Sequence, residues 1–156
     1  MKHVSLNARD IKIFSDAASA FFRQTTGIDA LVRTAYMLDG SDSAMRGDFK
    51  GIIELGGKFR GSVTFSASRG LLSHVLLLVG ESDYSDASHR DIVGEIANQM
   101  TGYARRHFGE ALDMSPPRVV ADKEPMPALP QEGTQFVIPL TWDRYESNLS
   151  VHMVCV

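Results

Sequence analysis

A carboxylate and an amide stand three residues apart in the segment SHRDIVGEIANQMTGYARRHF, residues 88–108. Apolar residues recur there every three or four positions, which predicts a long amphipathic helix. At about 100° per residue, Asp91, Glu95, Asn98 and Gly102 fall within roughly 60° on the polar side. Glu95 and Asn98 can therefore reach the same external group, and Gly102 lacks a side chain one turn further on, where a partner could lie close.

The opposite side of this helix is apolar and is expected to pack on a sheet. Its members are Ile92, Val93, Ile96, Ala97, Met100, Tyr103, Ala104 and Phe108. The polar stripe could be an ordinary solvated helix face. Asn and Gly argue for a function, because both are poor helix formers, Gly by about 1 kcal/mol relative to Ala.

Other catalytic and metal-binding patterns are missing. Gly51 and Gly56 have P-loop spacing, but Gly57 follows where lysine is required. There is no G-x-G-x-x-G opening a helix and no G-x-S-x-G elbow. Cys155 is the single cysteine, so it is interpreted as a small core residue, and the five histidines form no H-E-x-x-H pattern. A metal site or a nucleophile in this chain has little support.

Composition limits the classes of protein further. The 156 residues are 44% apolar and 22% charged, with net charge −3 and pI near 5.9. These values indicate one globular domain over residues 1–156 and exclude the basic excess typical of nucleic-acid binding. The longest aliphatic run, Val75–Val79, is far below the ~20 residues of a membrane span. We expect a cytoplasmic protein with neither a membrane nor a nucleic-acid partner.

Several elements must position the polar stripe. Apolar spacing predicts a first helix over residues 8–27. Alternation predicts a strand over 28–38, and β-branched residues in 49–55 and 61–67 predict a hairpin. A short helix capped by Ser68 follows through Val79, and because it is apolar on nearly every side we expect it to be buried all round.

The last third of the chain is proline-rich before a closing hairpin. Five of the six prolines lie between Pro116 and Pro130, so that only RVVAD, residues 118–122, is expected to form a strand there. QFVIPLTW and NLSVHMVCV form the predicted hairpin. The fold class is therefore α+β, with a six-stranded, mostly antiparallel sheet and helices packed on it. The element order also suggests an internal duplication of an αβββ unit, with chance similarity as the alternative.

The stretch DIVGEIANQMTG, from Asp91 to Gly102, resembles the signature D/S-x-x-x-E-x-x-N of the CheC, CheX and FliY chemotaxis phosphatases. Pro117 resembles the proline that follows this helix in the family. The element order also resembles the CheC-like fold. Some members carry the signature on both long helices, but Ile13 and Asp16 occupy the equivalent places in the first helix. The resemblance is therefore to the single-site CheX type.

The resemblance implies a phosphatase that hydrolyses the aspartyl phosphate of a CheY-like response regulator. Glu95 would then bind the regulator's lysine, Asn98 would orient the attacking water, and Asp91 and Gly102 would contact the partner. The regulator would supply Mg²⁺, so no cofactor is expected in this chain. A homodimer joined through sheet edges is also implied, with NLSVHMVCV as a candidate edge, although a buried strand fits its sequence equally well.

Two other functions remain open from the sequence. The same stripe could belong to a non-catalytic adaptor of a chemotaxis or two-component pathway. The segment 114–130 could instead act as the lid of a ligand-sensing domain. In the phosphatase interpretation, His89, Arg90, Arg105 and Arg106 could tune the encounter with a particular regulator, or simply be solubilising charges.

Overall fold

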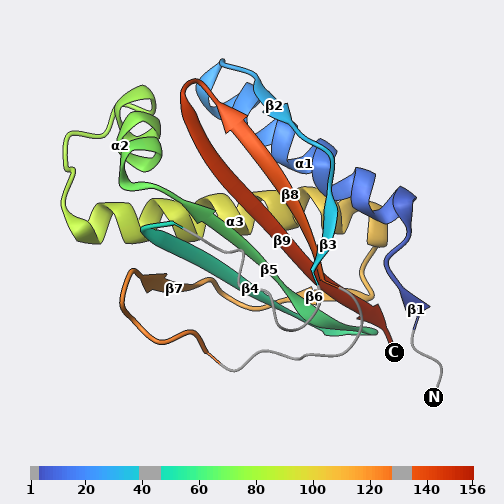
Figure 1. The fold of residues 1–156 in the computed structure, drawn as a ribbon. Coiled ribbons are helices and arrows are strands. Elements are labelled where there is room, and N and C mark those ends of the chain that lie inside the picture. The colour runs from blue at the N-terminus through green and yellow to red at the C-terminus, as the bar shows by residue number, and fades with distance from the viewer. Residues whose placement is uncertain (1–3, 39–46, 128–134) are drawn as a thin grey trace.

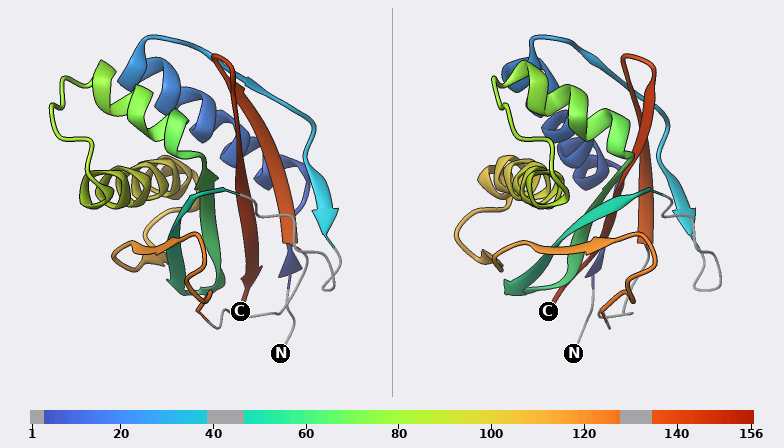
Figure 2. Two further views of the ribbon diagram at one scale, coloured as in Figure 1. Left: turned by 60° about the vertical axis from the view of Figure 1, so that its left-hand side comes forward. Right: turned by 90° about the vertical axis from the view of Figure 1, so that its left-hand side faces the viewer.

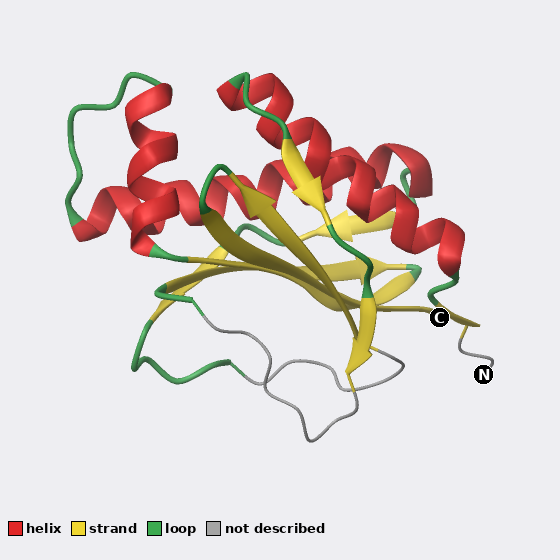
Figure 3. Ribbon diagram, turned by 45° about the horizontal axis from the view of Figure 1, so that its top comes forward, coloured by secondary structure: helices red, strands yellow, loops and turns green. Residues whose placement is uncertain are grey.

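The structure is a computed structural model that describes residues 4–38, 47–127 and 135–156. Three helices, α1 (Ala8–Thr26), α2 (Arg69–Leu78) and α3 (Asp86–Phe108), lie against one antiparallel sheet. Figures 1 and 3 show the helices together on one side of this sheet. The predicted α+β class with a mostly antiparallel sheet is confirmed.

The sheet contains nine strands among the described residues rather than the predicted six. They are β1 (Val4–Ser5), β2 (Ala30–Val32), β3 (Tyr36–Leu38), β4 (Phe49–Gly57), β5 (Phe59–Ala67), β6 (Leu112–Met114), β7 (Arg118–Ala121), β8 (Gln135–Trp142) and β9 (Tyr145–Cys155). The order is β2-β8-β9-β5-β4-β6, with β3 beside β8, β7 beside β4 and β1 beside β9. This order is symmetric about the central β5–β9 pair, as a duplicated αβββ unit would be, and the duplication itself stays a prediction.

The strand predicted over 28–38 is divided into β2 and β3. Both pair with β8, β2 with residues 140–142 and β3 with residues 135–137. Pro139 lies between the two paired stretches and has no N–H to donate, so the ladder is interrupted there. Its carbonyl still accepts a hydrogen bond from the backbone N–H of Arg33 at 2.9 Å. The two short strands β1 and β6 escaped prediction because two or three residues are too few to show alternation.

The prediction that NLSVHMVCV forms a sheet edge is wrong. These residues belong to β9, which pairs with β5 along one side and with β8 along the other. Leu149 and Val151 are accordingly buried. The alternative that this is a buried strand is the one that the structure confirms.

The first helix is closed by local hydrogen bonds at both ends. The Asn7 side chain accepts from the Asp10 N–H while the Asp10 carboxylate accepts from the Asn7 N–H, which forms a capping box. Gly27 ends the helix at φ 74°, a left-handed conformation that suits glycine. The buried residues of α1 include Phe14, Phe21 and Phe22.

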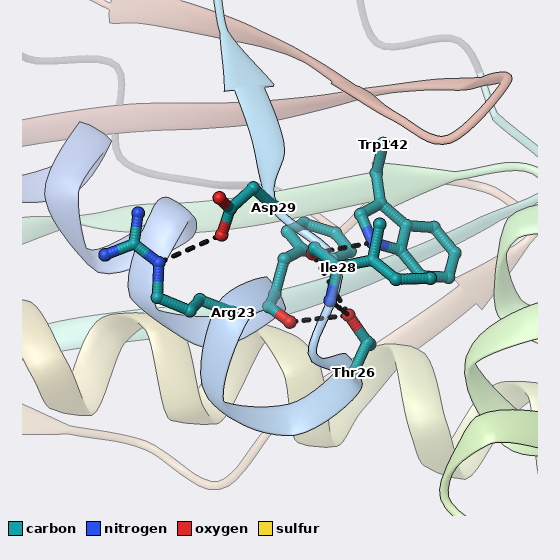
Figure 4. Close-up of polar contacts among 6 residues, drawn as sticks. Arg23, Thr26, Ile28, Asp29 and Trp142 are labelled. Carbon is teal, nitrogen blue, oxygen red and sulfur yellow. Dashed lines mark hydrogen bonds and ion pairs between the residues drawn. The ribbon is translucent and has the colours of Figure 1, made fainter.

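The turn that follows α1 ties it to the sheet. The indole N–H of Trp142, at the end of β8, donates to the Ile28 carbonyl at 3.1 Å (Figure 4). Arg23 pairs with Asp29 at 2.9 Å across the same turn. Trp142 also stacks on Phe22 with ring centroids 5.3 Å apart, so that α1 and β8 share one core.

The second helix begins as predicted but is not buried all round. The Ser68 hydroxyl caps it by accepting from the Leu71 N–H at 3.2 Å. α2 packs against α3 and β9 and buries Leu71, Leu72 and Val75. Its end is open to solvent, since Leu77 is 61% exposed and Val79 is 46% exposed. No described helix is long and apolar enough to cross a membrane.

Candidate functional site

The long helix α3 crosses the sheet and carries the polar stripe (Figure 1). It is capped at its start by Ser85, whose hydroxyl accepts from the Ser88 N–H, and at its end by Gly109. Most of the predicted apolar side is buried: Val93, Ile96, Ala97, Met100 and Ala104 are fully buried, and Ile92, Tyr103 and Phe108 are partly buried. The predicted orientation of the helix is therefore confirmed.

Two glycines hold the middle of α3 close to its neighbours. A Cβ on Gly51 of β4 would lie 2.5 Å from the Val93 carbonyl oxygen, so only glycine fits at this approach. A Cβ on Gly94 would lie 3.2 Å from Val119 and 3.3 Å from Pro117. Pro117 thus packs on the turn of α3 that carries Glu95. These contacts fix the helix at the level of the stripe.

All four predicted site residues lie away from the core. Asp91 and Glu95 are exposed, whereas Asn98 and Gly102 are half-buried. One Glu95 carboxylate oxygen accepts a hydrogen bond from the Gln99 amide at 2.9 Å. The Asn98 amide makes no side-chain hydrogen bond to any described residue, and a Cβ on Gly102 would meet nothing within 4 Å. An amide with unused donors and acceptors therefore stands one turn from a charged carboxylate, beside an open surface.

Shallow grooves flank the stripe at both of its ends. A groove of about 300 Å³ runs between the end of α2 and α3, where Asp91 and Glu95 line it. Another, of about 450 Å³, lies next to Gly102 and is lined by Arg105 and Arg106. The surface is consequently acidic beside Asp91 and Glu95, whereas beyond Gly102 it carries Arg105 and Arg106 together with Glu110. Such an arrangement suits a protein partner with a complementary charge pattern.

A family model described as chemotaxis phosphatase CheX matches residues 49–141, which include the whole of α3. This chain belongs to the CheX family. The family predicted from the sequence is thereby confirmed. A search of curated proteins finds no match.

Solved structures share the CheX fold over nearly the whole chain. A CheC-like superfamily protein from Shewanella sp. PV-4 aligns with TM-score 0.81 and 23% identity, covering 95% of this chain and 99% of that one. The chemotaxis protein CheX of Vibrio vulnificus aligns with TM-score 0.79 and 22% identity, covering 94% and 99%. A chain of the CheX-CheY-BeF3-Mg²⁺ complex of Borrelia burgdorferi aligns with TM-score 0.71 and 18% identity, covering 92% and 96%.

One of the residues expected to tune the encounter in this CheX-family chain is buried. His89 is 1% exposed; its Nδ1–H donates to the Ser85 carbonyl at 2.8 Å and its Nε2 lies 2.7 Å from the Ser73 hydroxyl. The expectation that His89 meets a partner is therefore wrong. The helical wheel contained the signal, because His89 precedes the buried Val93 by four residues.

The three arginines of that group already have contacts within the chain. Arg90 pairs with Glu124. The Arg105 guanidinium donates to the Leu112 carbonyl at 2.6 Å, and Arg106 lies 4.7 Å from the centre of the Tyr103 ring. Arg105 and Arg106 remain exposed and keep their charge near Gly102. Their positive charges can still act on a protein that approaches this surface. Arg90, in contrast, is half-buried and paired with Glu124.

The remaining candidates form no metal site within the described residues. Among the described residues, no group of three or more His, Cys, Asp or Glu side chains could hold a metal ion. Cys155 is half-buried at the end of β9. Of the segment 114–130, residues 118–121 form β7 and pair with β4, while residues 128–130 lie outside the described residues.

Proposed function

We propose that this CheX-family chain hydrolyses the aspartyl phosphate of a phosphorylated CheY-like response regulator. The observation that supports this proposal is the pair formed by exposed Glu95 and half-buried Asn98, on the outward side of a helix held on the sheet. The family is described as a phosphatase of chemotaxis, and a relative from Borrelia burgdorferi was crystallised in complex with CheY. The pair would enter the active site of the regulator.

Asn98 would position the water molecule. In hydrolysis of an acyl phosphate, the water oxygen bonds to phosphorus as the aspartyl oxygen leaves, which gives inorganic phosphate and a free carboxylate. The amide of Asn98 can accept a hydrogen from this water and donate one to a phosphoryl oxygen. Holding the water in line is the main requirement, so a neutral side chain suffices.

Glu95 would dock on the lysine of the regulator. Its carboxylate is exposed and charged, and the hydrogen bond from Gln99 restrains its rotamer before the partner arrives. Asp91, one turn earlier, adds a second negative charge that orients the same cation. Mg²⁺ bound by the regulator would neutralise the phosphoryl charge. This chain would contribute an amide and carboxylates.

The test is phosphate release from a regulator phosphorylated by a small-molecule phosphodonor. We expect the wild-type chain to accelerate release, and Asn98→Ala to lower kcat on the order of 10²-fold. Asn148→Ala is the matched control, since Asn148 is also half-buried but lies on β9. The proposal is wrong if the wild type binds without accelerating release, as an adaptor would, or if Asn98→Ala keeps the full rate.

A further inference from the structure

The end of α2 exposes a group of large apolar side chains. Leu77, Leu78 and Val79 are 61%, 40% and 46% exposed, and Tyr84 in the following loop is 43% exposed. Leu77 and Tyr84 line the same hollow, and Leu78 and Val79 follow Leu77 directly at the end of the helix. We call these four residues the α2 patch. Apolar side chains gathered in this way on a protein surface are typical of interaction sites.

The α2 patch is held in place by its backbone. Gly80 adopts a left-handed conformation at φ 83° directly after Val79. The N–H of Gly80 donates to the Leu77 carbonyl at 3.1 Å, and the N–H of Glu81 donates to the Leu76 carbonyl at 2.9 Å. This pair of bonds is the Schellman arrangement that closes a helix. The exposed leucines therefore belong to an ordered turn, and little entropy would be lost on binding.

The α2 patch adjoins the candidate site directly. Val79 lines the groove of about 300 Å³ whose other wall contains Asp91 and Glu95. Figures 1 and 2 show α2 beside the first half of α3. A protein that inserts a group between α2 and Glu95 would contact Val79, and the rest of the patch lies beside this contact.

The charges of the groove select the kind of partner. Glu81, Asp91 and Glu95 line it, and none of its lining residues in the described part of the chain is basic. A cation surrounded by apolar side chains complements this arrangement. A second copy of the same surface would set these carboxylates against one another, because a two-fold interface pairs each patch with itself.

We infer that the α2 patch is a second contact for the same response regulator, next to the contact between its lysine and Glu95. This inference rests on the proposed function. The patch would bind apolar side chains that surround the regulator's lysine. Regulators with different apolar side chains around this lysine would then bind with different affinity, so the patch would determine which regulator is bound.

The experiment removes the apolar surface without touching Asn98 or Glu95. We expect the double variant Leu77→Ser, Val79→Ser to raise KM for the phosphorylated regulator on the order of tenfold and to leave kcat unchanged, because the lost contact is made equally before and during hydrolysis. Leu31→Ser, Met37→Ser is the control, since these residues are 60% and 65% exposed on β2 and β3. Circular dichroism verifies the fold of both variants.

A parallel binding titration with the beryllofluoride-activated regulator separates the two proposals. A tenfold higher Kd for the α2 variant supports the patch, whether or not the wild type accelerates phosphate release. A wild type that binds but accelerates no release would overturn the phosphatase proposal alone. An unchanged KM and Kd, or an equal loss in the control, overturns the patch while leaving the phosphatase proposal intact. Absence of any binding by the wild type overturns both.

Discussion

At the scale of single residues, the roles proposed for Glu95 and Asn98 differ in what they require from the fold. A carboxylate acts on a cation over several ångströms, so Glu95 tolerates small changes of position. An amide that orients a water molecule acts only within hydrogen-bond reach, so Asn98 needs a fixed backbone. Asn98 is the more buried of the two and makes no side-chain hydrogen bond within the described chain, so its donors and acceptors are available for the proposed contact.

Substitutions at Gly102 should affect the stability of the fold and the binding of the partner in different ways. Its backbone is helical and a Cβ there would meet nothing within 4 Å, so Gly102→Ala should stabilise the protein by about 1 kcal/mol in urea unfolding. Gly102→Tyr should also fold, but its ring would keep the regulator away from the stripe and raise KM on the order of tenfold. Full activity of Gly102→Tyr would show that the partner does not approach this turn.

Among the elements, α3 shows what the sequence could and could not predict. Its apolar residues recur every three or four positions from Ile92 to Phe108, so both its existence and its outward side were predictable. The close contact of Gly51 with Val93 was not, because it joins residues 42 positions apart. The exposure of the end of α2 was also not predicted. A helix rich in leucine and valine can be covered on all sides or on one side only, and its sequence does not distinguish the two.

The contact between α3 and β4 allows a direct test of how the stripe is supported. Gly51→Ala would place a Cβ 2.5 Å from the Val93 carbonyl, so the helix must move away, at a cost of about 1–3 kcal/mol in unfolding free energy. Gly56→Ala in the same strand is the control, because its Cβ would meet only the Asp113 Cβ, at 3.7 Å. If the two variants unfold at the same urea concentration, β4 does not constrain α3 in this way.

The Glu124 carboxylate links the turn after β7 to Arg90 of α3, and this contact should depend on pH. Glu124 accepts hydrogen bonds from the Ala121 N–H and from Arg90, and these bonds hold the pKa of Glu124 below its usual range. A lowered pKa in the folded state contributes stability that is complete above the ordinary carboxyl pKa and is lost as pH falls through the lowered value.

The expected result is a difference in stability between wild type and Glu124→Gln that is present at pH 6 and shrinks towards pH 3. Urea midpoints measured at each pH would show it. Glu110→Gln is the control, because Glu110 is exposed in the turn after α3 and forms no hydrogen bond within the described residues. A wild-type advantage that stays constant down to pH 3 would contradict the assignment of this contact to the ionised carboxylate.

Over the whole molecule, both αβββ-like halves contribute to one core. The central strands β5 and β9 come from different halves and pair over nine residues, and α1 and α3 cover them together. A pattern of alternation cannot reveal this arrangement, because a strand at the centre and a strand at the edge of a sheet can have the same sequence. The interior position of β9 therefore had to come from the structure.

A shared core predicts that the two halves unfold together. Leu149 of β9 is fully buried and faces Phe65 of β5 in the sheet register, so Leu149→Ala should lower the unfolding free energy by about 2–5 kcal/mol. Trp142, the single tryptophan, is fully buried against Phe22 of α1 and reports on the other end of the sheet by fluorescence. Far-UV circular dichroism reports on all three helices.

Both signals should shift to the same lower urea midpoint in Leu149→Ala, because one cooperative transition changes them together. Leu31→Ala supplies the reference, since a side chain that is 60% exposed on β2 should change the free energy by less than about 0.5 kcal/mol. If the fluorescence and circular dichroism midpoints of Leu149→Ala differed from each other, the two halves would not be unfolding in one transition. The support of α3, and with it the position of Asn98, would then depend on one half of the sheet alone.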